Sequence, residues 1–343
     1  MMFGAMMNNH LIFFSGGKAS FAVAHWVKEK YPEDNVVLYF TDTIWEDDDL
    51  YRFLHEAADK LKLPMLIQSM DITPLQLMYE KELVFNSRLG ECSRILKQKV
   101  SRDFIFKGKS PKREEWRNKE LLKNEDFLTD AKLYFGIGID ELHRKDAIEY
   151  NWQPYEVIFP LMEEDIDIDE LLKLYEIDKP RLYLLNFSHN NCAGRCIKGG
   201  QGHFVNLLEK DPQAFAELEE AEIVLNSLIN EVKPIKLRIK EEEDEDIKEM
   251  LKEKKEQVKL KYWSYFYEDD KSILKKLFPN GQKYKYSFMK KQINGEMVPY
   301  QLRDLRNDYQ SEIKLDLFDI GGCGCFIDFD EEGREKEINL ISK

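Results

Sequence analysis

Long apolar runs and excess positive charge are both missing from this sequence. No run in the 343-residue chain reaches the roughly 20 apolar residues that a membrane-spanning helix needs. The opening residues, MMFGAMMNNH, contain no basic stretch followed by a cleavable apolar segment, so we expect no signal peptide and a cytoplasmic protein without a membrane partner. The net charge of −14 opposes nonspecific sliding on nucleic acid, although it permits a local basic groove.

Cysteine is scarce, with five residues, and an odd number does not suit a framework of disulfides. In a reducing compartment, clustered cysteines bind metal or do redox chemistry more often than they form disulfides. Four of them form two close pairs, Cys192 with Cys196 and Cys323 with Cys325. Four thiolates suit a structural zinc ion or an iron–sulfur cluster, and spacing alone does not choose between them. His189 and His203 are alternative ligands, and buried free thiols are the alternative interpretation.

The two most familiar nucleotide-binding loops are absent, because neither G-x-x-x-x-G-K-[ST] nor G-x-G-x-x-G occurs. Instead, an apolar run at residues 11–14 ends in a Ser-Gly-Gly-Lys-Ala-Ser turn at residues 15–20. A segment of helical periodicity follows, and a second apolar run occupies residues 36–40. This order of strand, glycine turn, helix and strand predicts a βαβ unit.

The residue types in this turn suit a phosphate group. Gly16 and Gly17 let a bulky anion approach the backbone, and the amides of the first helical turn point outward at the positive end of the helix dipole. Ser15, Lys18 and Ser20 add hydroxyl and ammonium donors. The alternative is an ordinary strand–turn–helix connection with a serine N-cap.

Periodicity predicts several further elements. We expect helices at 50–63, at 166–175 and from Asp211 to about residue 230, and strands at 65–69, 133–139 and 157–159. The charged stretch 107–130 reads as an insertion or a mobile lid. The stretch 236–256 reads as a charged linker or exposed helix, and the aromatic residues 262–267 are β-prone.

The turn at residues 15–20 resembles the PP-loop of the adenine-nucleotide alpha-hydrolase superfamily, usually S-G-G-x-D-S, in its phosphoadenosine phosphosulfate (PAPS) reductase-like branch. Ala19 stands where many members carry Asp. The resemblance covers residues 8 to 220 and implies an α/β fold with a mostly parallel doubly wound sheet. We expect a nucleotide-binding domain at 8–235 and a helical or mixed C-terminal extension at 257–343 that contributes one cysteine pair. The implied ligands are ATP, or a sulfated adenylate, and Mg²⁺.

The resemblance also implies site residues outside the turn. Asp42 and Thr43 end the second strand, where relatives contact the nucleotide. Arg94 lies in a basic helical segment that faces the phosphates in relatives, with a solvated helix as the alternative. Gly138 and Arg144 follow the strand at 133–139, where relatives carry a glycine and then charged residues near the phosphates. Ordinary solvation of a strand end is the alternative there.

The function that the resemblance implies is that of an ATP pyrophosphatase-type enzyme, which adenylates a substrate and releases pyrophosphate. Lys18, Arg94 and Arg144 would neutralise charge on the phosphates. Several such enzymes that transfer sulfur to a nucleic acid carry a four-iron cluster, so a nucleic-acid or nucleotide acceptor and a sulfur-donor protein are expected partners. One alternative is a sulfonucleotide reductase with Cys92 or Cys192 as nucleophile, although the Glu-Cys-Gly-[IL]-His motif of PAPS reductases is absent. The other is a nucleotide-binding module without catalysis.

Overall fold

The computed structural model describes residues 7–86, 89–277, 285–313, 315–319 and 321. They form two compact units. Unit 1 contains residues 7–72 and 91–196, and unit 2 contains the described residues of 73–90 and those from 197 onward. The charged stretch 236–256 lies inside unit 2, across the end of α11 (Pro212–Glu241) and the first part of α12 (Glu245–Tyr267).

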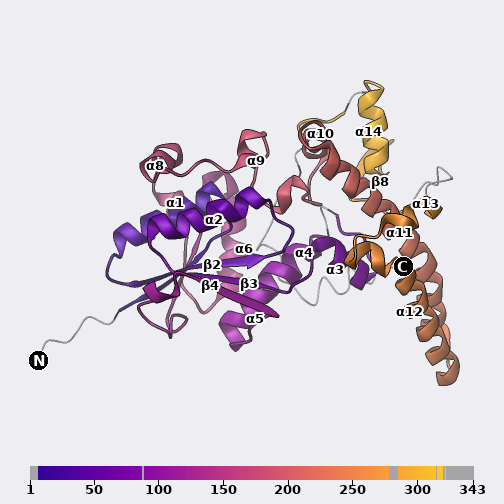
Figure 1. Ribbon diagram of the computed structural model, residues 1–343, viewed down its shortest axis with the longest axis horizontal. Coiled ribbons are helices and arrows are strands. Elements are labelled where there is room, and N and C mark those ends of the chain that lie inside the picture. Colours follow the sequence, from indigo (N-terminus) through magenta and orange to yellow (C-terminus); the bar gives the residue numbers. More distant parts are fainter. Residues whose placement is uncertain (1–6, 87–88, 278–284, 314, 320, 322–343) are drawn as a thin grey trace, which may run out of the picture. The chain divides into compact units, whose positions relative to one another are not determined.

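A six-stranded sheet forms the centre of unit 1 (Figure 1). The strands are β1 (Asn9–Phe13), β2 (Asn35–Asp42), β3 (Met65–Ser69), β4 (Arg113–Arg117), β5 (Lys132–Phe135) and β6 (Val157–Ile158), in the order β4-β3-β2-β1-β5-β6. Every neighbouring pair is parallel except β3 and β4. The predicted α/β class with a mostly parallel sheet is therefore confirmed. The strand order reverses between β1 and β5, and ligands of open α/β sheets bind beyond the carboxyl ends of strands at such a point.

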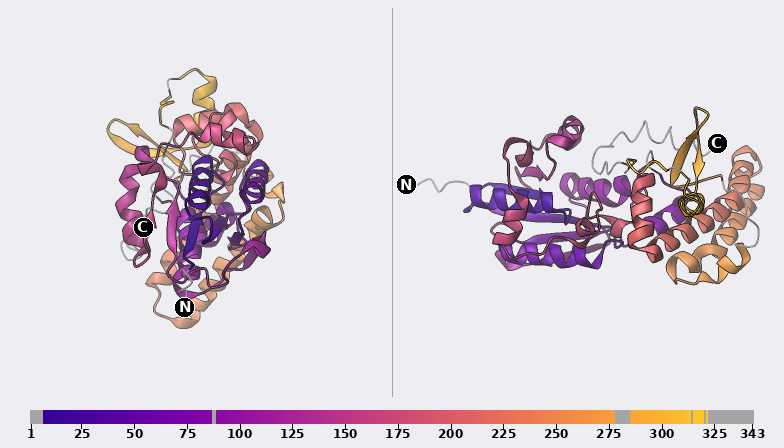
Figure 2. Two further views of the ribbon diagram at one scale, coloured as in Figure 1. Left: turned by 90° about the vertical axis from the view of Figure 1, so that its left-hand side faces the viewer. Right: turned by 90° about the horizontal axis from the view of Figure 1, so that it is seen from above.

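Helices cover both faces of this sheet (Figure 1 and Figure 2). Alternate residues of a strand point to opposite faces, so neighbours such as Leu11 and Ile12 enter different cores. One core joins the sheet to α1 (Lys18–Lys30), α2 (Asp48–Leu61) and α8 (Ile168–Leu174). The other joins it to α5 (Val100–Lys107) and α6 (Lys145–Trp152). The turn at residues 15–20, after β1, is thus attached to a rigid sheet.

The edge strand β4 lies within the charged stretch that we predicted to be an insertion or lid. It pairs antiparallel with β3 and places Trp116 opposite Leu66. The rest of its sequence, Arg-Glu-Glu-Trp-Arg, is charged, which is how natural sheets protect an exposed edge from pairing with other chains. The sequence did not predict this strand, because an edge strand with one apolar residue has no hydrophobic alternation to reveal it.

Unit 1 also contains short helical elements, between its later strands and after the last one. They are α4 (Glu91–Ser93), the π-helix η1 (Arg94–Lys99), η2 (Lys119–Leu121), η3 (Ile139–Arg144), α7 (Pro160–Glu163), α9 (Arg181–Leu184) and η4 (Cys192–Gly194). The π-helix lies between α4 and α5 without a break, and such segments are frequent at functional sites.

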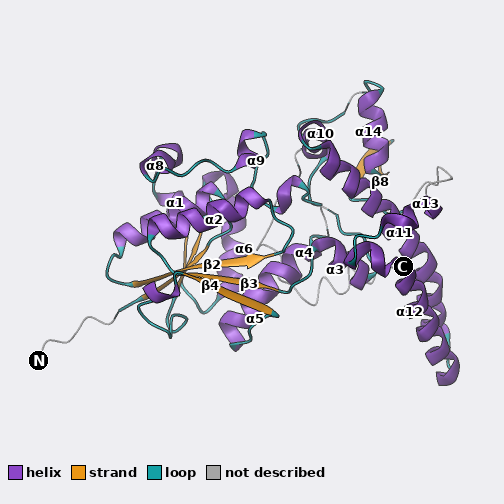
Figure 3. Cartoon of the chain, viewed as in Figure 1, coloured by secondary structure: helices purple, strands orange, loops and turns teal. Residues whose placement is uncertain are grey.

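Unit 2 is mainly helical (Figure 3). Its elements are α3 (Pro74–Lys81), α10 (Gln201–Lys210), α11, α12, η5 (Lys271–Ile273), α13 (Leu274–Leu277), the hairpin β7 (Met289–Ile293) and β8 (Glu296–Tyr300), and α14 (Leu302–Gln310). α11 starts at the predicted Asp211 cap but continues well past residue 230. The aromatic residues 262–267 belong to α12 and not to a strand. Among the described residues, no helix combines the length and the apolar composition that crossing a membrane requires.

Candidate functional site

The turn after β1 has the backbone of an anion-binding loop. Gly16 adopts a φ of +74°, a backbone conformation that favours glycine. A Cβ on it would also lie 2.8 Å from Cγ of Leu50, so packing disfavours a larger residue as well. Gly17 is the N-cap of α1, and no side chain caps this helix. The serine N-cap of the alternative interpretation is therefore not formed. Amides in an uncapped first turn are suited to bind an anion.

The side chains of the turn divide into two roles. Ser20 is buried and donates its hydroxyl to the carbonyl of Gly17 at 2.9 Å, so it braces the turn. Ser15 is exposed, with its hydroxyl 3.4 Å from that of Ser20. The ammonium of Lys18 lies 5.3 Å from the centre of the Tyr183 ring, within the range of a cation–π contact. Ser15 and Lys18 are therefore the better candidates for direct contact with a ligand.

The chain after β5 lies directly against this turn. A Cβ on Gly136 would lie 2.7 Å from the backbone nitrogen of Ser20 and 3.0 Å from the carbonyl carbon of Ala19. Backbone atoms cannot rotate away, so this close approach requires glycine. Gly138 is the N-cap of η3, and a Cβ there would meet only the Asp140 carboxylate, at 3.0 Å. The turn after β1 and the end of β5 thus meet at the point where the strand order reverses.

A pocket lies at the carboxyl ends of β1 and β2. Its lining is Phe13, Phe14, Ser15, Tyr39, Phe40, Thr41, Lys97 and Asn191. Half of these residues are aromatic, and the others supply two aliphatic hydroxyls, one amide and one ammonium. Mostly apolar walls with a few polar groups are typical of small-molecule sites.

Asp42 and Thr43 follow this pocket at the end of β2, and protein groups engage both. The Asp42 carboxylate accepts hydrogen bonds from the Tyr51 hydroxyl at 2.8 Å and from the Ile44 amide at 2.7 Å. Burial raises the pKa of this carboxyl, although the Tyr51 hydroxyl opposes the shift. The Thr43 hydroxyl donates to Glu46 at 2.8 Å. Their contact with a nucleotide stays a prediction.

Glu46 joins three parts of the site. Its side chain is fully buried, accepts hydrogen bonds from the Thr43 hydroxyl and the Cys192 backbone amide, and lies 3.4 Å from the ammonium of Lys97. Buried charges need such partners, because desolvation of an unpaired charge is costly. Lys97 therefore stands in the pocket wall with its charge balanced by Glu46.

The two arginines predicted to contact phosphate each have a carboxylate partner nearby in sequence. Arg94 donates from Nε and Nη2 to the two oxygens of Glu91, at 2.9 and 2.7 Å. Arg144 is buried and forms an ion pair with Glu141. Lys97 is close in sequence to Arg94 but pairs with Glu46, so the structure divides these basic residues between different carboxylates. Their roles toward phosphate stay predictions.

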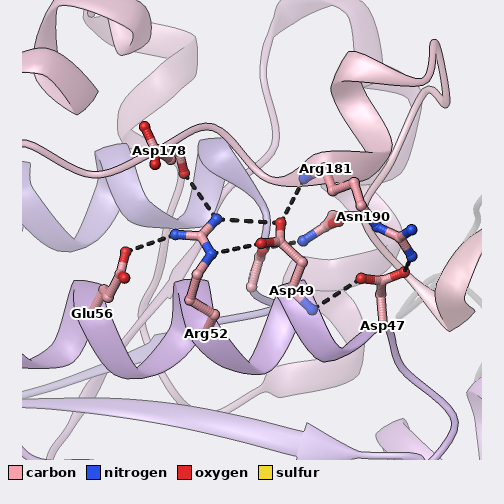
Figure 4. Close-up of polar contacts among 8 residues, drawn as sticks. Asp47, Asp49, Arg52, Glu56, Asp178, Arg181 and Asn190 are labelled. Carbon is pink, nitrogen blue, oxygen red and sulfur yellow. Dashed lines mark hydrogen bonds and ion pairs between the residues drawn. The ribbon is translucent and has the colours of Figure 1, made fainter.

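Residues 178–192, which we call the strap, are fastened to the first turns of α2 (Figure 4). The backbone amide of Arg181 donates to Asp49 at 2.6 Å, and its guanidinium forms an ion pair with Asp47. Arg52 donates to the carbonyl of Asp178 at 3.1 Å and to Asp49 from Nε at 2.5 Å. The charged residues at the start of α2 thus anchor the strap as well as the helix.

The other end of the strap is attached to the turn at residues 15–20. Asn190 donates from Nδ2 to the carbonyl of Gly16 at 2.9 Å and is 2% exposed. Its Oδ1 has no hydrogen-bond partner among the described residues. The Tyr183 hydroxyl lies 3.0 Å from the position that a Cβ on Gly17 would take. The strap therefore contacts both glycines of the turn.

The described cysteines of the predicted metal site are adjacent. The hydrogen bond with the Cys196 thiol, and then burial, raise the pKa of the Cys192 thiol well above its usual range. Both thiols are reduced. Cys323 and Cys325 lie outside the described residues. Within the described ranges, no group of three or more His, Cys, Asp or Glu side chains is arranged to hold a metal ion.

The alternative histidine ligands lie in different units. The His189 ring, in unit 1, accepts a hydrogen bond from the Asn191 amide at 3.4 Å, and His203 is buried in α10 of unit 2. Neither belongs to a metal-binding group within the described residues.

Glu46, Tyr183 and Asn190 are the parts of the site that sequence reasoning missed. Glu46 was hidden in an acidic run that reads as a favourable helix start, and Tyr183 and Asn190 act across more than 150 residues. The only sequence signal was polar and aromatic residues in a segment without regular periodicity.

No family model, curated protein or solved structure matches this chain.

Proposed function

We propose that unit 1 binds an adenine nucleotide and acts as an ATP pyrophosphatase-type enzyme of the PP-loop kind. The observation that supports this most directly is the uncapped, glycine-lined turn where the strand order reverses, beside a pocket whose lining is half aromatic. In this proposal the amides of the turn and Lys18 bind the polyphosphate, and the aromatic residues of the small pocket, about 40 Å³ in volume, contact part of the nucleoside.

The reaction would transfer the adenylyl group of ATP to an acceptor. A nucleophilic oxygen of the acceptor attacks the α-phosphorus, the bond to the bridging oxygen breaks, and pyrophosphate leaves. Lys18 would balance the charge that develops on the phosphates, and Arg94 and Arg144 would contribute by exchanging their carboxylate partners for phosphate. Ala19 removes one carboxylate from the turn, so Mg²⁺, which commonly binds through substrate phosphates, would enter mainly on the nucleotide.

The metal proposal concerns Cys192, Cys196, Cys323 and Cys325. The first two are adjacent and supply half of a four-thiolate set. Within unit 2, the segment that leads to Cys323 returns to the start of α10, where the Gly202 amide donates to the Asp319 carbonyl at 2.8 Å. α10 itself begins shortly after Cys196 in the chain. Zinc would make the site structural, and an iron–sulfur cluster would suit sulfur transfer to a nucleic-acid or nucleotide acceptor.

The test is calorimetric titration of the full chain with ATP and Mg²⁺. Lys18→Gln removes the ammonium at the turn and should weaken ATP binding about tenfold, since a charge-assisted hydrogen bond is lost. Lys28→Gln changes the same residue type near the other end of α1 and should leave the affinity unchanged. Pyrophosphate release with candidate acceptors then tests for catalysis.

The possible results separate the candidate functions. If the wild-type protein binds no ATP, the proposal is wrong. ATP binding without pyrophosphate release with any acceptor would favour a non-catalytic module. Reduction of PAPS by a thiol donor, lost on changing Cys92 or Cys192, would favour a sulfonucleotide reductase, although the raised pKa of Cys192 disfavours an attacking thiolate there.

A further inference from the structure

Tyr183 lies over the nucleotide-type turn, residues 15–20, and has no part in the assignments above. Its hydroxyl is 3.0 Å from the Cβ position of Gly17, and its ring lies 5.3 Å from the Lys18 ammonium. Gly17 is the N-cap of α1. A phenol hydroxyl and an ammonium therefore flank the same uncapped helix start, and both can donate hydrogen bonds.

The strap holds this tyrosine in place from both sides. Arg181, two positions earlier, is bound to Asp47 and Asp49, and Asn190 is bound to the Gly16 carbonyl. A donor that is positioned before a ligand arrives loses less conformational entropy on binding. The position of Tyr183 thus results from several long-range contacts.

Asn190 gives an independent sign that a ligand belongs beside the strap. Its amide is 2% exposed, and its Oδ1 accepts no hydrogen bond from any described residue. Buried polar atoms are nearly always paired in folded proteins, so an unfilled acceptor here calls for a donor. The hydroxyl and amino groups of a nucleotide are such donors.

We propose that the strap is a second wall of the nucleotide site, where the Tyr183 hydroxyl donates a hydrogen bond to a phosphate oxygen and Asn190 accepts one from a hydroxyl or amino group of the nucleoside. This inference rests on the nucleotide site proposed above and adds a phosphate-binding residue to it. A triphosphate offers three phosphate groups among which the turn amides, Lys18 and Tyr183 can be divided, whereas a monophosphate offers one.

The experiment compares Tyr183→Phe with the wild-type chain in titrations with ATP and with AMP, both in Mg²⁺. Phenylalanine keeps the ring over Lys18 and removes only the hydroxyl. ATP affinity should fall about tenfold, and AMP affinity should change less than about twofold. Tyr175→Phe is the matched control, because its hydroxyl contacts His25 at 2.9 Å, on a helical turn of α1 beyond the nucleotide-type turn, and neither affinity should change.

Several outcomes would overturn the inference while leaving the proposed function intact. Unchanged or tighter ATP binding by Tyr183→Phe would mean that the hydroxyl donates nothing, or that the ring obstructs the site. Equal losses for ATP and AMP would assign Tyr183 to the nucleoside. Hydrogen exchange on the wild-type chain gives a second measurement, in which ATP but not AMP should slow exchange in residues 181–185. If the wild-type chain binds neither ATP nor AMP, the proposed function itself is wrong.

Discussion

At the residue scale, the candidate site combines local motifs with distant contacts, and only the former can be predicted from sequence. The glycines of the turn follow from a short pattern between a strand and a helix. The acidic run after β2 has a charge pattern that favours a helix start, and Asp47 caps α2. Its neighbour Glu46 turns inward to Lys97 and Cys192, which only the packed structure could reveal.

Gly136 offers a test of the close approach between β5 and the nucleotide-type turn. Gly136→Ala should destabilise the protein by roughly 1–3 kcal/mol, because its Cβ would press on backbone atoms of Ser20. Gly138→Ala is the control and should cost less, since it meets only the Asp140 carboxylate, which can rotate away. Denaturant unfolding of the two variants measures the difference. Equal losses of unfolding free energy in the two variants would contradict the tight packing at Gly136.

The buried pair of Glu46 and Lys97 predicts strong coupling. Glu46→Gln should cost about 3 kcal/mol, because it leaves a buried ammonium without its carboxylate. Adding Lys97→Met should recover part of that loss, which a double-mutant cycle in urea would measure. The partly exposed pair Lys145–Glu149 is the comparison, where Glu149→Gln should change stability by less than about 1 kcal/mol. Additive effects of the two changes at Glu46 and Lys97 would mean that the pair is not coupled.

At the element scale, the Glu222 carboxylate joins the segment before the C-terminal hairpin, and the start of α14, to α11 in unit 2. Glu222 in α11 accepts hydrogen bonds from the backbone amides of Phe288, just before β7, and Leu302, the first residue of α14, both at 2.9 Å. Burial raises the pKa of Glu222 to about 8, and the charges of Asp304 and Glu219 add to the shift. Glu219 is itself buried, and Arg306 pairs with it at 2.8 Å.

This raised pKa predicts a pH-dependent stability. The folded chain holds the Glu222 proton more tightly than the unfolded chain, whose carboxyl has a pKa near 4.5. The free energy of unfolding should therefore fall as pH rises from about 5 to about 8, with a slope of up to about 1.4 kcal/mol per pH unit, and level off above that. Glu222→Gln should flatten the curve. Denaturant unfolding at several pH values measures it.

The matched control for this prediction is Glu220→Gln. Glu220 lies on the same helix but is partly exposed and pairs with Lys271 at 2.8 Å. Glu220→Gln should leave the slope of the free energy of unfolding against pH unchanged. Equal pH slopes for the wild-type chain and Glu222→Gln between pH 5 and 8 would show that Glu222 is ionised in the folded protein.

The other elements could be predicted where the local sequence pattern was distinctive, and could not where packing decided the structure. β3 occupies the predicted residues 65–69, because a short apolar segment between a proline and a turn is distinctive. Residues 262–267 have strand-type composition, but they continue a helix whose ion pairs include Lys248–Glu245 and Lys252–Glu249. Packing against α11 overrides the local preference there.

At the scale of the whole molecule, the metal proposal predicts that cysteines far apart in the sequence act together. Cys192→Ser and Cys323→Ser should each abolish metal binding, because a four-thiolate site tolerates the loss of one ligand poorly. Cys92→Ser should retain the metal. Metal analysis of the anaerobically purified protein and its absorbance near about 400 nm would distinguish zinc from iron–sulfur. Full metal content in both ligand variants would exclude the site.

The described residues of unit 2 come from two separate stretches of chain, and this affects how the protein can be truncated. A product ending at residue 196 would include every strand of the large sheet, but it would also include α3 without its neighbours. Tyr79 of that helix packs on Phe266 with ring centres 5.1 Å apart, and its hydroxyl donates to the Lys259 carbonyl at 3.1 Å. Such a fragment would present bare apolar residues to water and should aggregate. Replacing residues 73–90 by a short polar connector offers a more soluble half-protein.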